Sequence, residues 1–155
     1  AAKELLEKIA DLDIIITPVS GGGLLAGTSL LAKSINPNIK VYGAEPKNAD
    51  DTYRSIKNKK IVPNKTTETI ADGLRAQVGT ITFPIIQKNV DGIILVSEEM
   101  IIQSMRTIWQ RMKIIIEPSC SIALAAILIN NEQFHNKRIG IILTGGNVDL
   151  DSLPW

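Results

Sequence analysis

The sequence predicts an α/β fold, in which helices cover both faces of a parallel sheet. First, short apolar runs rich in β-branched residues alternate with stretches whose apolar residues recur at helical spacing. Second, these runs are almost continuously apolar, which is typical of strands buried on both faces. Third, a helix-length segment separates each pair of runs, as parallel strands require. Since 155 residues is the length of one ordinary domain, we expect a single α/β domain over residues 1–155.

The first part of the chain predicts two strands and two helices. Residues 1–12 carry apolar side chains at helical spacing with charges between them, which indicates an amphipathic helix. Residues 13–17, "DIIIT", form a short β-branched run before a proline and are interpreted as a buried strand. A helix is expected from Gly22 to about Ile35, because its apolar pattern stops before "NPN". Residues 39–46, "IKVYGAEP", predict the second strand.

The second part begins with a weakly patterned stretch, residues 47–77, which contains an expected loop at "VPNKTTE". Ser97 is a suitable N-cap for a long helix, and the two glutamates that follow it suit the positive end of the helix dipole. The expected elements here are a helix near 80–89, a strand at 92–96, the helix after Ser97, a helix at 119–130 and a last strand at 138–144.

Composition excludes several classes of partner. The 17 basic and 16 acidic residues are interleaved and leave a net charge of +1, so neither nucleic acid nor an anionic membrane is favoured. No apolar run reaches the roughly 20 residues that a membrane helix needs, and no signal-peptide pattern is present. A single cysteine, Cys120, excludes an internal disulfide, and we expect a cytoplasmic protein.

The stretch "TPVSGGGLLAGTSLLAKS", residues 17–34, places three adjacent glycines between the first strand and the next helix. Without side chains, the backbone amides of Gly21, Gly22 and Gly23 can approach an anion closely, and the helix start adds positive potential. The alternative is a tight turn that needs a positive φ at one or two of the glycines. We favour a phosphate-binding loop.

Three kinds of phosphate loop compete for this stretch. The loop of nucleoside-triphosphate-binding proteins requires a lysine where this chain has Thr28, which excludes that class. The dinucleotide fingerprint G-x-G-x-x-[GA] fits Gly21, Gly23 and Ala26, and Glu45 ends the second strand, where an acid would bind a ribose. A dinucleotide- or phosphate-binding Rossmann-like module without catalysis is therefore the alternative function.

The loop and four further motifs together favour a third kind of phosphate loop. The stretches "SGGGLLAG", "YGAEPKNADD", "ETIADGL", "IEPSCSIALAA" and "LTGGNVD" follow one another in this order. In order and spacing they resemble the C-terminal half of the serine/threonine dehydratase and serine racemase family, which are pyridoxal-phosphate enzymes of fold type II. The resemblance covers nearly the whole chain and places it in the large, cofactor-binding domain. "AEPKNADD" and "GGNVDLDSL" favour the serine racemase branch.

The resemblance implies which residues bind the cofactor. The glycine loop matches the segment that binds the 5′-phosphate of pyridoxal phosphate, and Thr144 matches the hydroxyl residue that faces the pyridine nitrogen. Glu117 matches a position beside the cofactor ring and Gly73 one that lines the pocket, although a helix-start acid and a turn glycine are alternatives. A neutral hydroxyl leaves the ring a weaker electron sink than a carboxylate would, which suits β-elimination. The implied cofactor-binding residues are Ser20, Gly21, Gly22, Gly23, Leu24, Gly73, Glu117 and Thr144.

The resemblance also implies a divalent cation. Glu45, Asp51 and the carbonyl of Ala49 match the cation site of the serine racemase branch. Mg²⁺ and Ca²⁺ prefer such oxygen ligands, completed by water. The alternative is that both acids are solvated loop residues that cap a helix starting at "DDTYRSI".

The catalytic groups of the family are not found in this chain. Family members run to roughly twice this domain-sized length, and their Schiff-base lysine lies in the N-terminal half, in a Ser-x-Lys-x-Arg-Gly context. "SIKNKK" lacks the Arg-Gly and stands elsewhere in the sequence. The serine that serves as second base belongs to the small domain. We therefore expect this chain alone to be inactive and to require an N-terminal half.

The resemblance further implies the reaction and the assembly. The complete enzyme would act on L-serine or L-threonine, giving a 2-oxo acid and ammonia by elimination or the D-amino acid by reprotonation. We expect it to be a homo-oligomer, a dimer. If part of the enzyme is missing from the chain, an apolar face should be exposed, and the chain should self-associate or bind a second chain.

Overall fold

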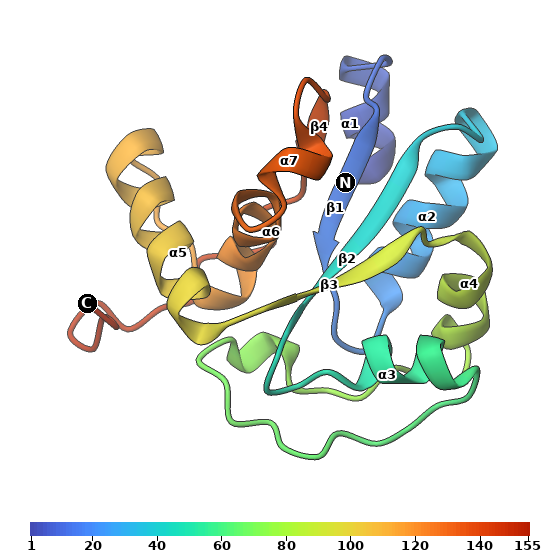
Figure 1. The fold of residues 1–155 in the computed structure, drawn as a ribbon. Helices are drawn as coiled ribbons and strands as arrows, with labels where there is room; N and C mark the ends of the chain where they lie inside the picture. Colours follow the sequence, from blue (N-terminus) through green and yellow to red (C-terminus); the bar gives the residue numbers. More distant parts are fainter.

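The computed structural model describes residues 1–155 and contains one parallel four-stranded sheet in the order β3-β2-β1-β4 (Figure 1). Each pair of neighbouring strands is parallel, and the register places Thr17 beside Gly43 and Glu45 beside Leu95. The expected α/β class with a parallel sheet is confirmed. The strands are β1 (Ile14–Pro18), β2 (Lys40–Pro46), β3 (Gly92–Val96) and β4 (Ile139–Ile141).

Helices cover both faces of this sheet, because successive strand residues point to opposite sides. Ile15 of β1 packs with helices α1, α2 and α4 on one face, whereas its neighbours Ile14 and Ile16 pack with α6 on the other. Helix α5 lies outside α6 and makes its main contacts with that helix. The bounds are α1 (Ala2–Lys8), α2 (Gly23–Ile35), α4 (Thr82–Asn89), α5 (Glu98–Met112) and α6 (Pro118–Leu128).

The stretch without a clear pattern contains two short elements, α3 (Asp51–Asn58) and the 3₁₀ turn η1 (Asp72–Leu74). A four-residue helix, α7 (Asn131–Phe134), precedes β4 and was not expected from the sequence. Strand β4 is shorter than the predicted run 138–144: the N–H of Ile142 makes a last bond to Ile16 of β1, and the chain then continues to a second glycine turn. Helix α1 likewise ends at Lys8 rather than at residue 12.

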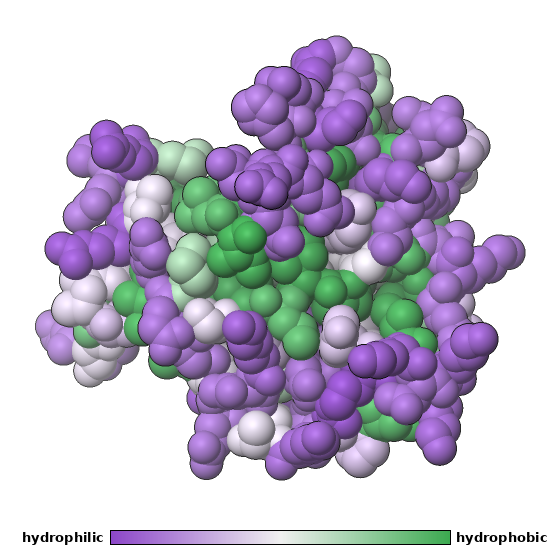
Figure 2. All heavy atoms as spheres, in the orientation of Figure 1, coloured by the Kyte–Doolittle hydropathy of each residue, from purple (hydrophilic) through white to green (hydrophobic).

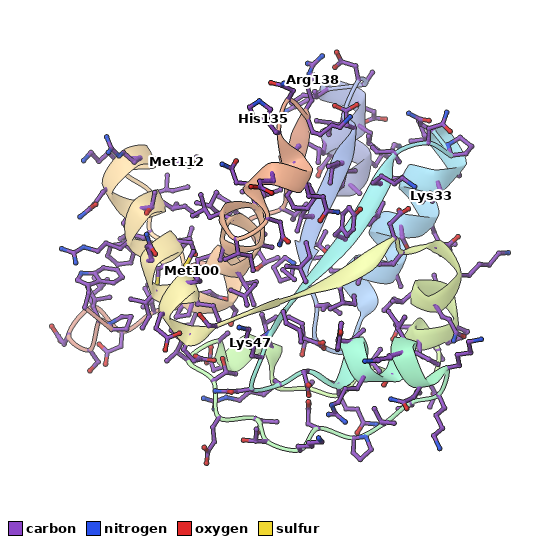
Figure 3. All side chains as sticks on the ribbon, in the orientation of Figure 1. Lys33, Lys47, Met100, Met112, His135 and Arg138 are labelled. Carbon is purple, nitrogen blue, oxygen red and sulfur yellow. The ribbon has the colours of Figure 1, made fainter.

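One face of the molecule exposes apolar side chains. Figure 2 shows an apolar area on the side where β3 and α6 meet, and a shallow groove there is lined by residues that include Tyr42, Tyr53, Ile93 and Ile129. Strand β3 forms an edge of the sheet, and four of its five residues are only partly buried. This matches the expectation of an exposed apolar face. None of the helices could span a lipid bilayer, and the longest, α5, has 15 residues and ends at Met112, which is labelled in Figure 3.

Candidate functional site

The glycine loop joins the carboxyl end of β1 to the first turn of α2. Pro18 ends the strand, and Gly22 is the N-cap residue of α2 with a φ of +88°. Side-chain-bearing residues rarely adopt this left-handed conformation, so the turn interpretation holds at Gly22. Gly21 and Gly23 have no positive φ, and a Cβ on Gly23 would meet nothing within 4 Å. A turn requirement therefore explains only one of the three glycines.

The amides of this loop have no partner within the chain. The backbone N–H groups of Gly21, Gly22 and Gly23 donate to no backbone acceptor, and α2 has no side-chain cap. The first amides of a helix are left unsatisfied by the helix itself, and they carry the positive end of its dipole. Three adjacent free N–H groups at the start of a 13-residue helix are the donors that an anion-binding loop requires.

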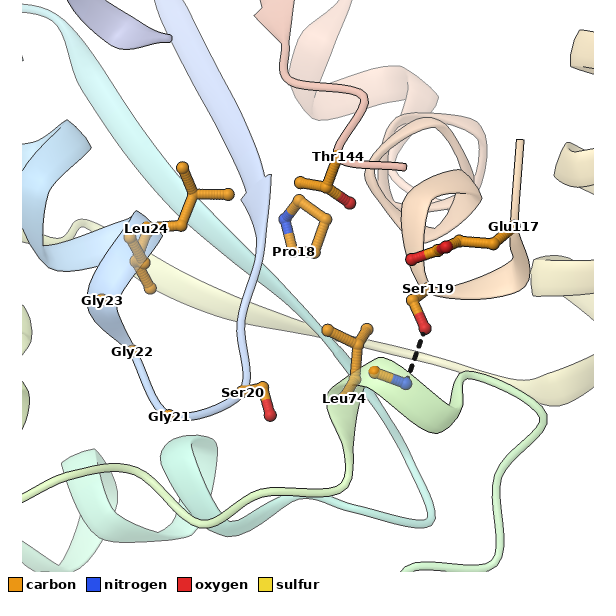
Figure 4. A pocket seen from close by; sticks show the side chains of 12 residues that line it. Pro18, Ser20, Gly21, Gly22, Gly23, Leu24, Leu74, Glu117, Ser119 and Thr144 are labelled. Atoms are coloured by element: carbon orange, nitrogen blue, oxygen red, sulfur yellow. Dashed lines mark hydrogen bonds between the residues drawn. The ribbon is translucent and has the colours of Figure 1, made fainter. Parts of the chain in front are cut away.

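A cavity of about 300 Å³ opens beside this loop. Figure 4 shows the glycine loop on one side of the cavity and Thr144 and Glu117 on the other, with the turn η1 below. The volume is in the range of small-ligand sites. The cavity is lined by all eight residues predicted to bind the cofactor, together with Pro18, Leu25, Leu74 and Ser119, which the sequence reasoning missed.

The far wall of the cavity is held by Glu117, the N-cap residue of α6. Its backbone N–H donates to the carbonyl of Gly145 (3.1 Å), and its Oε2 accepts from the N–H of Asn147 (2.8 Å). The second glycine turn packs closely against this region, since a Cβ on Gly146 would lie 2.7 Å from the carbonyl oxygen of Ile115. These contacts fix the turn that follows Thr144.

The η1 turn closes the cavity from a third side. The N–H of Gly73 donates to the Ser119 hydroxyl over 3.0 Å, drawn as a dashed line in Figure 4. A Cβ on Gly73 would come within 3.0 Å of the same hydroxyl oxygen, so a glycine allows this close packing. Ser119 stands two residues after Glu117 in the motif "IEPSCS", and this proximity was the available sequence signal.

The two acids proposed as cation ligands lie where β2 leads into α3. Glu45 is 1% exposed, and its carboxylate oxygens accept from the N–H groups of Thr52 and Tyr53, both over 2.9 Å. Asp51 is fully buried, and its Oδ2 accepts from the N–H of Val78 over 2.7 Å. Glu45 therefore caps α3, as expected from the alternative in which these acids cap the helix that starts at "DDTYRSI". The description of these acids as solvated is wrong, because the fold buries both.

The burial of this pair changes its acidity. Burial raises the pKa of Glu45 to about 8, the capping N–H groups of residues 52 and 53 oppose that rise, and the Asp51 carboxylate adds to it. Burial also raises the pKa of Asp51. Carboxylates of this kind are stabilised in the charged form by a cation.

The acid pair has the chemistry of a cation site. Asp51 Oδ1 is buried without a hydrogen-bond partner, and the carboxylate oxygens of Glu45 retain further lone pairs. Ala49 is buried on the loop between the two acids. The chain contains no cluster of three or more His, Cys, Asp or Glu side chains suited to a metal. A hard cation held here would therefore use two carboxylates, backbone carbonyl oxygen and water.

The geometry disfavours the dinucleotide alternative. That interpretation needs the acid at the end of β2 to reach a ribose hydroxyl beside the glycine loop. Glu45 instead turns both carboxylate oxygens onto the first turn of α3 and is not among the residues that line the cavity. The fingerprint glycines are thus present without the acid that would recognise the ribose.

Comparison with known proteins agrees with the geometry. The family described as "Pyridoxal-phosphate dependent enzyme" matches residues 1–145. The chain belongs to this family. The expected membership in the fold type II pyridoxal-phosphate enzymes is thereby confirmed. The cofactor used by this family is pyridoxal phosphate.

Individual members of the pyridoxal-phosphate family extend this result. The chain is 56% identical to the serine racemase of Dictyostelium discoideum over 160 residues, covering 99% of this chain and 48% of that protein. It is 43% identical to the β-hydroxyaspartate dehydratase of Paracoccus denitrificans, covering 99% and 49%. The structure of maize serine racemase matches with a TM-score of 0.93 and 44% identity, covering 97% of this chain and 47% of that one. The chain thus spans about half the length of these relatives.

Proposed function

We propose that this chain is the C-terminal, cofactor-binding part of a pyridoxal-phosphate dependent serine/threonine dehydratase or serine racemase. The observation that carries this proposal is the row of free N–H groups at Gly21–Gly23, on a loop that lies across one cavity from the Thr144 side chain. The named relatives support the class of reaction, since they are serine racemases and a hydroxyaspartate dehydratase.

The residues of this chain have binding and orienting roles in the proposal. The N–H groups of the glycine loop and the dipole of α2 bind the phosphate dianion. The Thr144 hydroxyl would face the pyridine nitrogen and, being neutral, would not hold it protonated. Glu117 fixes the turn of the far wall, and Ser119 fixes the η1 turn on the third side of the cavity. Bound pyridoxal phosphate supplies an electron sink for the carbanion formed at the α-carbon of the amino acid.

The groups that move protons belong to the other half of the enzyme in this proposal. No lysine lines the cavity that could carry the cofactor. The serine base is assigned to the small domain, because the resemblance to the family places it there. The substrates proposed are L-serine and L-threonine, with either a 2-oxo acid and ammonia or the D-amino acid as product. Elimination and racemisation require the same binding roles from this chain. The lysine and the serine base of the other half determine which of the two reactions follows.

We further propose that Glu45, Asp51 and the carbonyl of Ala49 bind Mg²⁺ or Ca²⁺. The burial of both carboxylates on one side of the β2–α3 junction and the raised pKa of Glu45 support this assignment. The site lies between β2 and α3, outside the cavity, so the cation would stabilise structure rather than contact the substrate.

Complementation tests the proposed function. The chain and a separately expressed N-terminal half, taken from the Dictyostelium relative, are assayed alone and mixed. We expect absorbance of lysine-bound cofactor and release of 2-oxo acid from L-serine only in the mixture, because the N-terminal half holds the catalytic groups and this chain holds the phosphate loop. Serine turnover by the chain alone would contradict the assignment of roles. Binding of a nicotinamide dinucleotide without pyridoxal phosphate would favour the dinucleotide module.

We expect the isolated chain to self-associate through its apolar β3–α6 face. Light scattering after size exclusion at increasing concentration should show species larger than the monomer. Ile129→Lys places a charge on this face and should shift the equilibrium toward monomer. Leu30→Lys, at a side chain 49% exposed on α2, is the matched control and should leave it unchanged. A chain that stays monomeric throughout would contradict this expectation.

A further inference from the structure

The segment from Ala76 to Thr82 packs against the outer side of the glycine loop. The Ser20 hydroxyl is within hydrogen-bond distance of both the carbonyl (3.2 Å) and the N–H (3.1 Å) of Ala76. The carbonyl of Gly21 accepts from the N–H of Gly79 (3.1 Å) and from the Thr82 hydroxyl (2.7 Å). More than fifty residues of sequence separate the two segments, so these contacts are tertiary.

The two hydrogen bonds to the Gly21 carbonyl determine where the next amide points. Neither Gly79 nor Thr82 lines the cavity, so this carbonyl is directed away from it. In a planar trans peptide the N–H group points opposite to the carbonyl. The N–H of Gly22 is therefore directed toward the cavity. If the peptide turned over, a carbonyl dipole would face the phosphate and repel it.

Thr82 makes the shorter of these two contacts and also explains the close packing at Gly22. Its hydroxyl has one proton and lies 2.7 Å from the Gly21 carbonyl but 3.1 Å from that of Gly79, so the bond to Gly21 is favoured. A Cβ on Gly22 would lie 2.7 Å from the same hydroxyl oxygen. The Thr82 side chain therefore sits directly behind the peptide that it orients.

We propose that Thr82 is a positioning residue of the phosphate loop, which holds the Gly21–Gly22 peptide with its N–H toward the cavity. This inference rests on the proposed function of the loop and adds a residue that never touches the ligand. The same segment is anchored on its other side, since the N–H of Val78 donates to Asp51. The segment from Ala76 to Thr82 thus contacts both the phosphate loop and the proposed cation pair.

Binding of two matched ligands tests the role of Thr82. Pyridoxamine 5′-phosphate and pyridoxamine differ only in the phosphate, and neither has the aldehyde that reacts with lysines. The phosphate preference is the ratio of their Kd values, measured by calorimetry on the 155-residue chain. Thr82→Val, which removes the hydroxyl, should lower this preference about tenfold, the value of a lost hydrogen bond to a preorganised group. Thr82→Ser should retain it.

Controls separate this role from folding and from the proposed function. Thr107→Val removes a hydroxyl that donates to a backbone carbonyl, as that of Thr82 does, but within the distant α5, and it should not change the preference. Thr82→Ala should match Thr82→Val; if only one of them loses the preference, the hydroxyl is not the cause and the inference fails. Full phosphate preference in both hydroxyl-free variants would also overturn it. A wild-type chain without phosphate preference would instead overturn the proposed function.

Discussion

Gly22→Ala is expected to abolish the phosphate preference of the chain and to destabilise the fold. The substitution forces an alanine into a left-handed conformation, with φ at +88°, which costs about 1–2 kcal/mol. Its Cβ would lie 2.7 Å from Thr82 Oγ1 and 2.8 Å from Ile86 Cδ1, both from α4. Relief of these contacts would move the loop away from α4 and rotate the peptide whose N–H faces the cavity.

Gly27→Ala is the matched control for this prediction. Gly27 lies inside α2, and a Cβ there would meet nothing within 4 Å. Alanine at such a position should stabilise the helix by about 1 kcal/mol. Urea denaturation and the Kd of pyridoxamine 5′-phosphate are measured for both variants. Wild-type binding by Gly22→Ala would show that the loop does not depend on the observed backbone conformation.

Removal of divalent cations is expected to make the stability of the chain strongly dependent on pH. Without a cation, buried Glu45 holds its proton up to a pKa of about 8, against 4.5 for an ordinary glutamate. The folded state then binds more protons than the unfolded state between these values, so stability falls as pH rises through this window. A shift of this size corresponds to a loss on the order of a few kcal/mol.

A bound cation should cancel this loss, because it compensates the charges of Glu45 and Asp51. We expect Mg²⁺ or Ca²⁺ to raise the Tm clearly at pH 8 and little at pH 5, with chelator as the reference. Glu45→Gln should remove most of the cation response. Glu132→Gln, which removes an exposed acid of α7, should leave it intact. An equal Tm in cation and in chelator at pH 8 would contradict the assignment of the cation site.

Most of the sheet could be predicted from the sequence because its strands are locally encoded. The run 92–96 is continuously apolar after its glycine, and β3 has these bounds. Helix α5 begins after Ser97, whose hydroxyl accepts from the N–H of Met100, as the capping pattern predicts. In both cases, neighbouring residues are sufficient to specify the element.

The elements that the sequence did not reveal depend on distant partners. Helix α3 is polar and short, and its first turn is capped by Glu45 from the preceding strand rather than by a local residue. Strand β4 stops at Ile141 because its pairing with β1 extends only to Ile16. The buried state of Glu45 and Asp51 also follows from tertiary packing, which a pattern of charges along the sequence does not contain.

The candidate site also contains some residues that the sequence predicts and others that depend on distant contacts. The glycine loop could be predicted because three glycines between a strand and a helix have few other uses, and the resemblance placed Gly73, Glu117 and Thr144. The residues that hold these groups in place could not be predicted. Ser119 and Thr82 act through backbone groups 46 and 61 residues away in the sequence. A lone serine or threonine gives no sign of such a contact.

A crystal structure of this chain with pyridoxal 5′-phosphate would show where the cofactor phosphate binds. We expect the phosphate oxygens to lie within hydrogen-bond distance of the N–H groups of Gly21, Gly22 and Gly23. We also expect the pyridine nitrogen to face the Thr144 hydroxyl across the same cavity. A phosphate bound elsewhere, with the amides of the glycine loop left free, would show that this loop is not the phosphate site.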